Sequence, residues 1–162
     1  GVIFDVDTDE VIIEGLAMPH SPRIFNGELY TLLSATGELV KIDVAKGSYE
    51  VLVKLDGFVR GMDLHEDYLF IGLSKLRENS STFAKLDFKT SVNEAGIVVV
   101  HLPTGSIAGK ISYQLSLDEI YDVHVLAGKT RPNILNTIKQ DYKHGLMIPE
   151  ATYWAKTQPE TH

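Results

Sequence analysis

The sequence predicts an all-β protein, organised as a β-propeller-like array of four-stranded antiparallel blades. A three-residue pattern occurs three times, as Phe4–Val6, Ile42–Val44 and Val100–Leu102. Each copy ends an apolar run and precedes a turn, and a repeat of roughly 40 residues made of short strands is typical of propeller blades. Short apolar runs also alternate with turn residues along most of the chain. At this period the 162 residues hold about three to four blades, so we expect an incomplete ring.

The expected strands follow in order from the N-terminus. Val2–Val6 and Val11–Glu14 form a first pair around a polar turn. Asn26-Gly27 then separates the run Ile24-Phe25 from Glu28–Leu33, and Asn-Gly between apolar runs is a strong hairpin signal. The further predicted strands are Leu39–Val44, Tyr49–Leu55, Arg60–Leu64, Tyr68–Leu73, Ile97–Leu102, Ile107–Tyr113 and Ile120–Leu126.

Two segments interrupt this regular pattern. The interval between the second and third copies is longer than the first, and we assign the excess to a polar insertion within 76–96. After Pro132 the strand pattern stops, and Asn133–Tyr142 is predicted as a short helix because its apolar residues share one helical face. The expected organisation is therefore residues 1–132 as propeller-like blades and 133–162 as a C-terminal extension.

Composition narrows the class of partner. The net charge is −7 and no basic stripe is present, which argues against a nucleic-acid surface. The chain has no cysteine, and no apolar run reaches the ~18–20 residues of a membrane span, so we expect a cytoplasmic protein. It begins with Gly1 rather than Met, inside a strand pattern, and we expect a truncated or processed start. An incomplete ring leaves strand edges open, which predicts pairing with a second copy as a homodimer.

The candidate site lies on the first strand of each blade, which lines the channel of a propeller. His20, Arg60 and Tyr121-Asp122 occupy equivalent places, with Arg23, Asp63 and His124 nearby. Arginine offers bidentate donors to carboxylate or phosphate groups. We therefore expect a small polar or anionic ligand, a glycan or a protein partner at the channel mouth, bound by His20, Arg23, Arg60, Asp63, Tyr121 and Asp122. The alternative is that these groups satisfy one another, with Arg60 paired to Asp122 or Glu119 across blades.

A divalent metal site is the second hypothesis. Asp63, Glu119 and Asp122, with His20 and His124, offer the oxygen and nitrogen ligands that a calcium-like ion or a related divalent cation uses. Such a site would indicate a metal-dependent hydrolase resembling lactonase-type propellers.

Serine nucleophiles are disfavoured, because neither Ser21 nor Ser34 lies in a nucleophile-elbow context. Ser34 and Ser74, at matching ends of equivalent strands, are predicted to be turn-forming hydroxyls.

Four motifs carry a family resemblance. They are PHSPR at Pro19–Arg23, the Arg60-Gly61 corner, GLSKLRE at Gly72–Glu78 and EIYDV at Glu119–Val123. In this order they resemble a family of uncharacterised bacterial proteins, the DUF4915 family, over roughly Gly15 to Pro132. The resemblance implies a longer β-propeller, of which this chain would be the C-terminal part. It implies no particular activity.

Overall fold

The computed structural model describes residues 1–75, 94–113, 117–130, 132, 138, 143, 145–148 and 151–154. Within these residues the protein consists of β-strands, turns and irregular segments, and all strand pairs are antiparallel. The chain divides into two compact units, residues 1–125 and 126–162. The predicted division after residue 132 falls inside the second unit.

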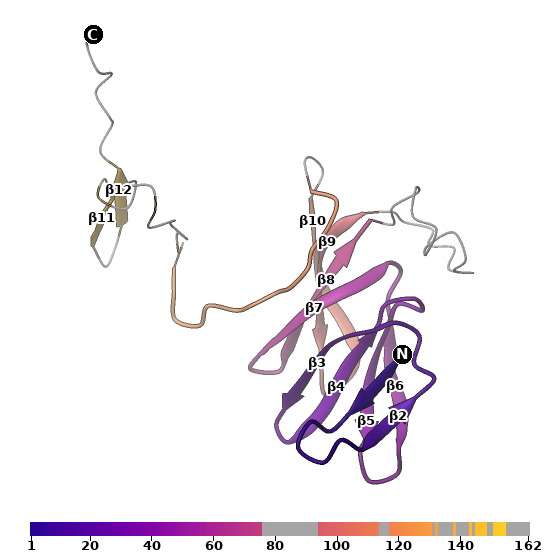
Figure 1. The fold of residues 1–162 in the computed structure, drawn as a ribbon. Coiled ribbons are helices and arrows are strands. Elements are labelled where there is room, and N and C mark those ends of the chain that lie inside the picture. Colours follow the sequence, from indigo (N-terminus) through magenta and orange to yellow (C-terminus); the bar gives the residue numbers. More distant parts are fainter. Residues whose placement is uncertain are drawn as a thin grey trace. The chain divides into compact units, whose positions relative to one another are not determined.

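Three sheets make up the first unit (Figure 1). The N-terminal sheet has two strands, β1 (Val2–Phe4) and β2 (Val11–Glu14). The second sheet has four strands in chain order: β3 (Pro19–Phe25), β4 (Glu28–Leu33), β5 (Glu38–Asp43) and β6 (Ser48–Lys54). The third has β7 (Phe58–His65), β8 (Tyr68–Ser74), β9 (Ala95–His101) and β10 (Ser106–Tyr113), again in chain order. The prediction of an all-β chain with antiparallel sheets is confirmed. The described sheets do not close into a ring, and their arrangement as a propeller stays a prediction.

The three-residue repeat marks equivalent strands. Its copies lie at the C-terminal ends of β1, β5 and β9, and each is followed by a hairpin to the next strand. The predicted insertion falls between β8 and β9, where residues 76–93 lie outside the described residues. The longer second interval of the repeat therefore corresponds to one connection between strands.

Successive sheets pack through two apolar layers. Leu32 and Leu39 of the second sheet share a fully buried cluster with Met62, Leu69 and Ile71 of the third. A second cluster joins the β1–β2 sheet to the other face of the second sheet, through residues Ile13, Leu16, Leu33, Val40 and Ile42. Burial of each such aliphatic side chain stabilises the fold by roughly 1.5–3 kcal/mol. These layers hold the three sheets in sequence order.

Strand β3 begins earlier than predicted, because Pro19–Arg23 is strand rather than a corner. Proline lacks an N–H, but β3 is an edge strand of its sheet and can accommodate it. A bulge between His20 and Arg23 places Ser21 at φ 54°. Strand β7 has a matching bulge between Val59 and Met62, with Gly61 at φ 76°. The same irregularity therefore recurs in the first strand of both four-stranded sheets.

The predicted strand Ile120–Leu126 is not formed. Residues 117–126 are irregular, and no strand of the described chain forms a ladder with them. They are held mainly through side-chain contacts with β7 and β8, which do not constitute a strand ladder.

The second unit contains a hairpin of β11 (Gly145–Ile148) and β12 (Ala151–Trp154), which the sequence did not predict. The predicted helix Asn133–Tyr142 lies outside the described residues apart from Ile138, which is in a bend. Among the described residues there is no helix of the length and apolarity that crossing a membrane requires.

Candidate functional site

Three segments converge where the predicted site residues lie: β3, β7 and the irregular stretch 117–125. The Gly61 N–H donates to Ser21 Oγ at 2.9 Å, which joins the two bulges. On its other side Gly61 lies against the next segment, because a Cβ added there would be 2.5 Å from Asp122 Cα. Glycine at this position therefore permits the close backbone approach that brings the three segments together.

Arg60 and Tyr121 form one contact of this site. The guanidinium carbon of Arg60 lies 4.3 Å from the centroid of the Tyr121 ring, within cation–π range. No ion pair joins Arg60 to Asp122 or Glu119, so the predicted pairing across blades is not what the structure shows. Within the described part of the chain, the Arg60 guanidinium makes no hydrogen bond or ion pair.

Arg23, rather than Arg60, binds Asp122. Nη2 of Arg23 lies 3.2 Å from Oδ1 and 3.1 Å from Oδ2 of this carboxylate. The two side chains are 38% and 60% exposed, so solvent screens the pair and limits it to roughly 0–1 kcal/mol. The pair connects β3 with the irregular segment and neutralises two of the predicted ligand-binding residues.

Asp63 also has partners from the same segment. Its Oδ2 accepts the Val125 N–H at 2.8 Å and lies 2.9 Å from His124 Nδ1, while Oδ1 accepts the Leu64 N–H at 3.0 Å. Both oxygens of the carboxylate are therefore engaged. This pattern indicates that Asp63 positions residues 117–125 on β7.

His20 lies in a network that leads to β7. Its Nδ1 is 2.7 Å from Ser34 Oγ and 3.2 Å from the Met18 carbonyl oxygen, and the Ser34 hydroxyl donates to the Val59 carbonyl. Burial, and next the positive charge of Arg60, lower the pKa of His20 below its ordinary value of 6.5. His20 is therefore neutral at pH 7, beside a charged guanidinium.

Ser34 and Ser74 act differently from the prediction. Each lies at the end of the second strand of its sheet, but each binds the backbone of the next sheet or segment rather than its own turn. Ser74 Oγ lies 3.0 Å from the Ile120 carbonyl and accepts the Ile120 N–H at 2.8 Å. Ser34 and Val59 make the equivalent contact one sheet earlier. The two serines therefore form hydrogen bonds between successive repeats.

A known protein family matches most of the chain. The model of the domain of unknown function DUF4915 matches residues 1–135, which include every site residue described above. The chain belongs to this family. No curated protein matches the chain. The family resemblance seen in the four sequence motifs is thereby confirmed.

The predicted metal ligands of the DUF4915 domain are distributed over different contacts. Asp63 lies beside His124, and Asp122 is bound by Arg23. The described residues contain no group of three or more histidine, aspartate or glutamate side chains that could hold a metal ion. The metal hypothesis, with Glu119 as its third carboxylate, has no geometric support from these residues and stays a prediction.

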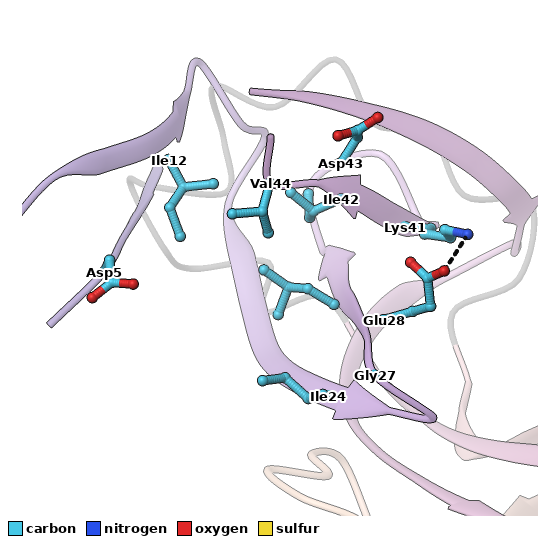
Figure 2. A pocket seen from close by; sticks show the side chains of 10 residues that line it. Asp5, Ile12, Ile24, Gly27, Glu28, Lys41, Ile42, Asp43 and Val44 are labelled. Atoms are coloured by element: carbon cyan, nitrogen blue, oxygen red, sulfur yellow. Dashed lines mark ion pairs between the residues drawn. The ribbon is translucent and has the colours of Figure 1, made fainter. Parts of the chain in front are cut away.

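The DUF4915 domain also has a cleft of approximately 520 Å³ away from the predicted residues (Figure 2). Ile24, Leu29 and Ile42 face it in one row across three paired strands, and the two-stranded sheet covers this row only in part, leaving Ile24 73% exposed. Lys41 and Glu28 at its rim pair at 3.2 Å, and this raises the pKa of Lys41. Since Asp43 is likewise paired with Lys46, both rim lysine–carboxylate pairs are satisfied internally.

Proposed function

We propose that this DUF4915 domain is a binding module that takes a small anionic or polar ligand at the site of His20, Arg60 and Tyr121. The observation that carries the proposal is the contrast between the two arginines of the site. Arg23 is bound to a carboxylate, whereas Arg60 lies on an aromatic ring without an ion pair among the described residues.

The donors of Arg60 are accessible to a ligand. In the described chain, every buried side-chain nitrogen or oxygen of a residue that is not exposed has a hydrogen-bond partner. Arg60 is partly exposed and its nitrogens have no such partner, so they contact solvent. The Tyr121 ring, 58% exposed, covers one face of the guanidinium and leaves its edge for a planar anion. Carboxylate and phosphate groups fit this edge by bidentate hydrogen bonds.

We also propose that the sheets are blades of a β-propeller and that the ligand binds at the mouth of its channel. Consecutive four-stranded antiparallel meanders, apolar layers between successive sheets and the repeated bulge in β3 and β7 support this arrangement. We propose in addition that the protein is bacterial and cytoplasmic, and that it pairs with a second copy at its open sheet edges. The residues 1–125 provide the binding site in either a monomer or such a dimer.

The proposal is tested by titrating the protein with acetate, citrate and inorganic phosphate. Binding is measured from the nuclear magnetic resonance signals of the backbone amides and the arginine side chains. At least one of these anions is expected to shift the Arg60 Nε–H signal in a saturable way. Arg60→Gln removes a charged donor, and hydrogen bonds to charged groups contribute about 1.5–3 kcal/mol. We therefore expect the affinity of that anion to fall by roughly 10- to 100-fold.

Lys54→Gln is the matched control, because it removes one positive charge from an exposed side chain on β6. It should leave the anion affinity within about twofold, since distant surface charges are screened. The proposal is wrong if no anion binds saturably, or if both variants lose affinity equally. It is also wrong if Arg60→Gln unfolds the protein, because Arg60 would then be a structural residue.

A further inference from the structure

The hydrogen bonds of His20 determine which nitrogen of its imidazole is the donor and which is the acceptor. The Ser34 hydroxyl gives its proton to the Val59 carbonyl, and the Met18 carbonyl can only accept. Both oxygens near Nδ1 therefore require a proton on that nitrogen. In the neutral ring this leaves Nε2 unprotonated, with its lone pair available as an acceptor.

This acceptor is exposed to solvent. His20 Nε2 makes no hydrogen bond within the described part of the chain, and no buried side-chain nitrogen there lacks a partner. His20 is only partly buried, so Nε2 has to be in contact with water. Its position is fixed, because Nδ1 is held by two oxygens and the ring lies edge-on to Phe58 with centroids 6.1 Å apart.

Acceptor and cation belong to one site. Ser34 connects the His20 ring to the Val59 carbonyl, and Val59 directly precedes Arg60. The Arg60 charge is close enough to lower the pKa of His20, in addition to the effect of burial. A ligand that spans the two residues meets guanidinium N–H donors and an imidazole lone pair.

We infer that the ligand is a hydroxylated anion, of the sugar-acid or sugar-phosphate class, whose anionic group binds Arg60 and whose hydroxyl donates to His20 Nε2. This inference rests on the proposed anion site at Arg60. A simple anion leaves the imidazole lone pair without a donor, and a neutral sugar leaves the guanidinium without an anionic partner. A hydroxyl placed within reach of both groups completes the hydrogen bonding of the site, which is the basis on which polar sites discriminate between ligands.

The test uses isothermal titration calorimetry at pH 7.5 with gluconate, glucose 6-phosphate, hexanoate and glucose. Gluconate and hexanoate have the same number of carbons and the same charge, so their difference reports the hydroxyl groups. We expect gluconate or glucose 6-phosphate to bind roughly three- to tenfold more tightly than hexanoate, as one neutral hydrogen bond provides. The better of the two identifies the anionic group as carboxylate or phosphate.

His20→Asn is the diagnostic variant, because an amide can still donate to Ser34 and lacks a group at the Nε2 position. It should bring the hydroxylated anion and hexanoate to within about twofold of each other, whereas Arg60→Gln should weaken both. If wild-type protein binds the hydroxylated and plain anions equally, or if His20→Asn keeps the difference, this inference is wrong and the anion site stands. If no anion binds, the proposed function itself is wrong.

A second measurement does not depend on any variant. Long-range ¹H–¹⁵N spectra of the imidazole distinguish a protonated Nδ1 from a protonated Nε2. The Nδ1–H tautomer is expected in the free protein at pH 7.5. Observation of the Nε2–H tautomer would overturn the inference, because Nε2 would then be a donor.

Discussion

Replacing Gly61 by alanine tests whether residues 117–125 pack on β7 as described. Gly61 has φ 76°, where an alanine costs roughly 1 kcal/mol more than a glycine. Its new Cβ would also lie 2.5 Å from Asp122 Cα and 2.8 Å from Val123 N. Carbon atoms in favourable contact are about 3.5–4.0 Å apart, so the Asp122 backbone has to move by about 1 Å.

That movement has a calculable cost. It would separate Asp122 from Arg23, a screened pair worth roughly 0–1 kcal/mol. It would also separate Val125 from Asp63, and the loss of that hydrogen bond destabilises the fold by about 0.5–1.5 kcal/mol. The two contacts together add roughly 0.5–2.5 kcal/mol to the backbone strain. We therefore expect Gly61→Ala to lower the free energy of unfolding by about 1.5–3.5 kcal/mol in total.

Gly15→Ala provides a control for backbone strain alone. Gly15 has nearly the same φ, 78°, and nothing lies within 4 Å of the position of its added Cβ. Urea denaturation of both variants, with equal m-values, should show Gly61→Ala less stable than Gly15→Ala by about 0.5–2.5 kcal/mol. Equal losses would refute the reasoning, because the approach of Asp122 to Gly61 would then not exist in solution.

Three further predictions concern the same unit. Ser74→Ala should cost about 1–3 kcal/mol by leaving the backbone groups of Ile120 unpaired, and Ser106→Ala, at the exposed first residue of β10, should cost little in the same denaturation experiment. Leu69→Ala, at a fully buried core position, should cost about 2–5 kcal/mol, and a loss below 1 kcal/mol would contradict the apolar layer between the sheets. Since the pKa of His20 is lowered in the folded protein, the unfolded chain takes up its proton first as the pH falls. The stability contributed by neutral His20 is complete above pH 6.5 and decreases as the pH falls from there to the lowered pKa. His20→Asn should therefore make the free energy of unfolding depend less on pH across that window. The same pH dependence in the variant and the wild-type protein would exclude the effect.

The local structure was predictable where turn chemistry determines it. Asn26 and Gly27 take φ 52° and 81°, as a two-residue hairpin turn requires, and the flanking strands pair as expected. Strand β3 was missed at its start because Pro19 and Pro22 argue against a strand unless its edge position is known. Ile120–Leu126 has strand-forming residues but no ladder partner among the described residues, and no residue pattern within the segment reveals that.

The contacts among the predicted site residues could not be predicted from the sequence. The equivalent places of His20 and Arg60 were predicted from the repeat, whereas the contact of Arg60 with the Tyr121 ring is seen only in the structure. Which arginine binds Asp122 depends on side-chain directions set by the bulges at Ser21 and Gly61. Arg23 and Asp122 are 99 residues apart, so no local pattern links them. The inter-sheet role of the two serines had a signal, their matching places in the repeat, but a hydroxyl at a strand end equally suits a turn.

The hydrogen bonds of Ser34 and Ser74 between successive repeats affect the order in which the first unit unfolds. Ser34 and Ser74 each connect one repeat to the one that follows it, and the apolar layers likewise join neighbouring sheets. Coupling of this kind is a sum of nearest-neighbour terms, as in linear repeat proteins. Among the described residues, the β1–β2 sheet and residues 117–125 each pack against one four-stranded sheet, so unfolding of this chain should start there. The amides of β4, β5 and β8, which have a neighbour on both sides, should be the last to exchange with solvent.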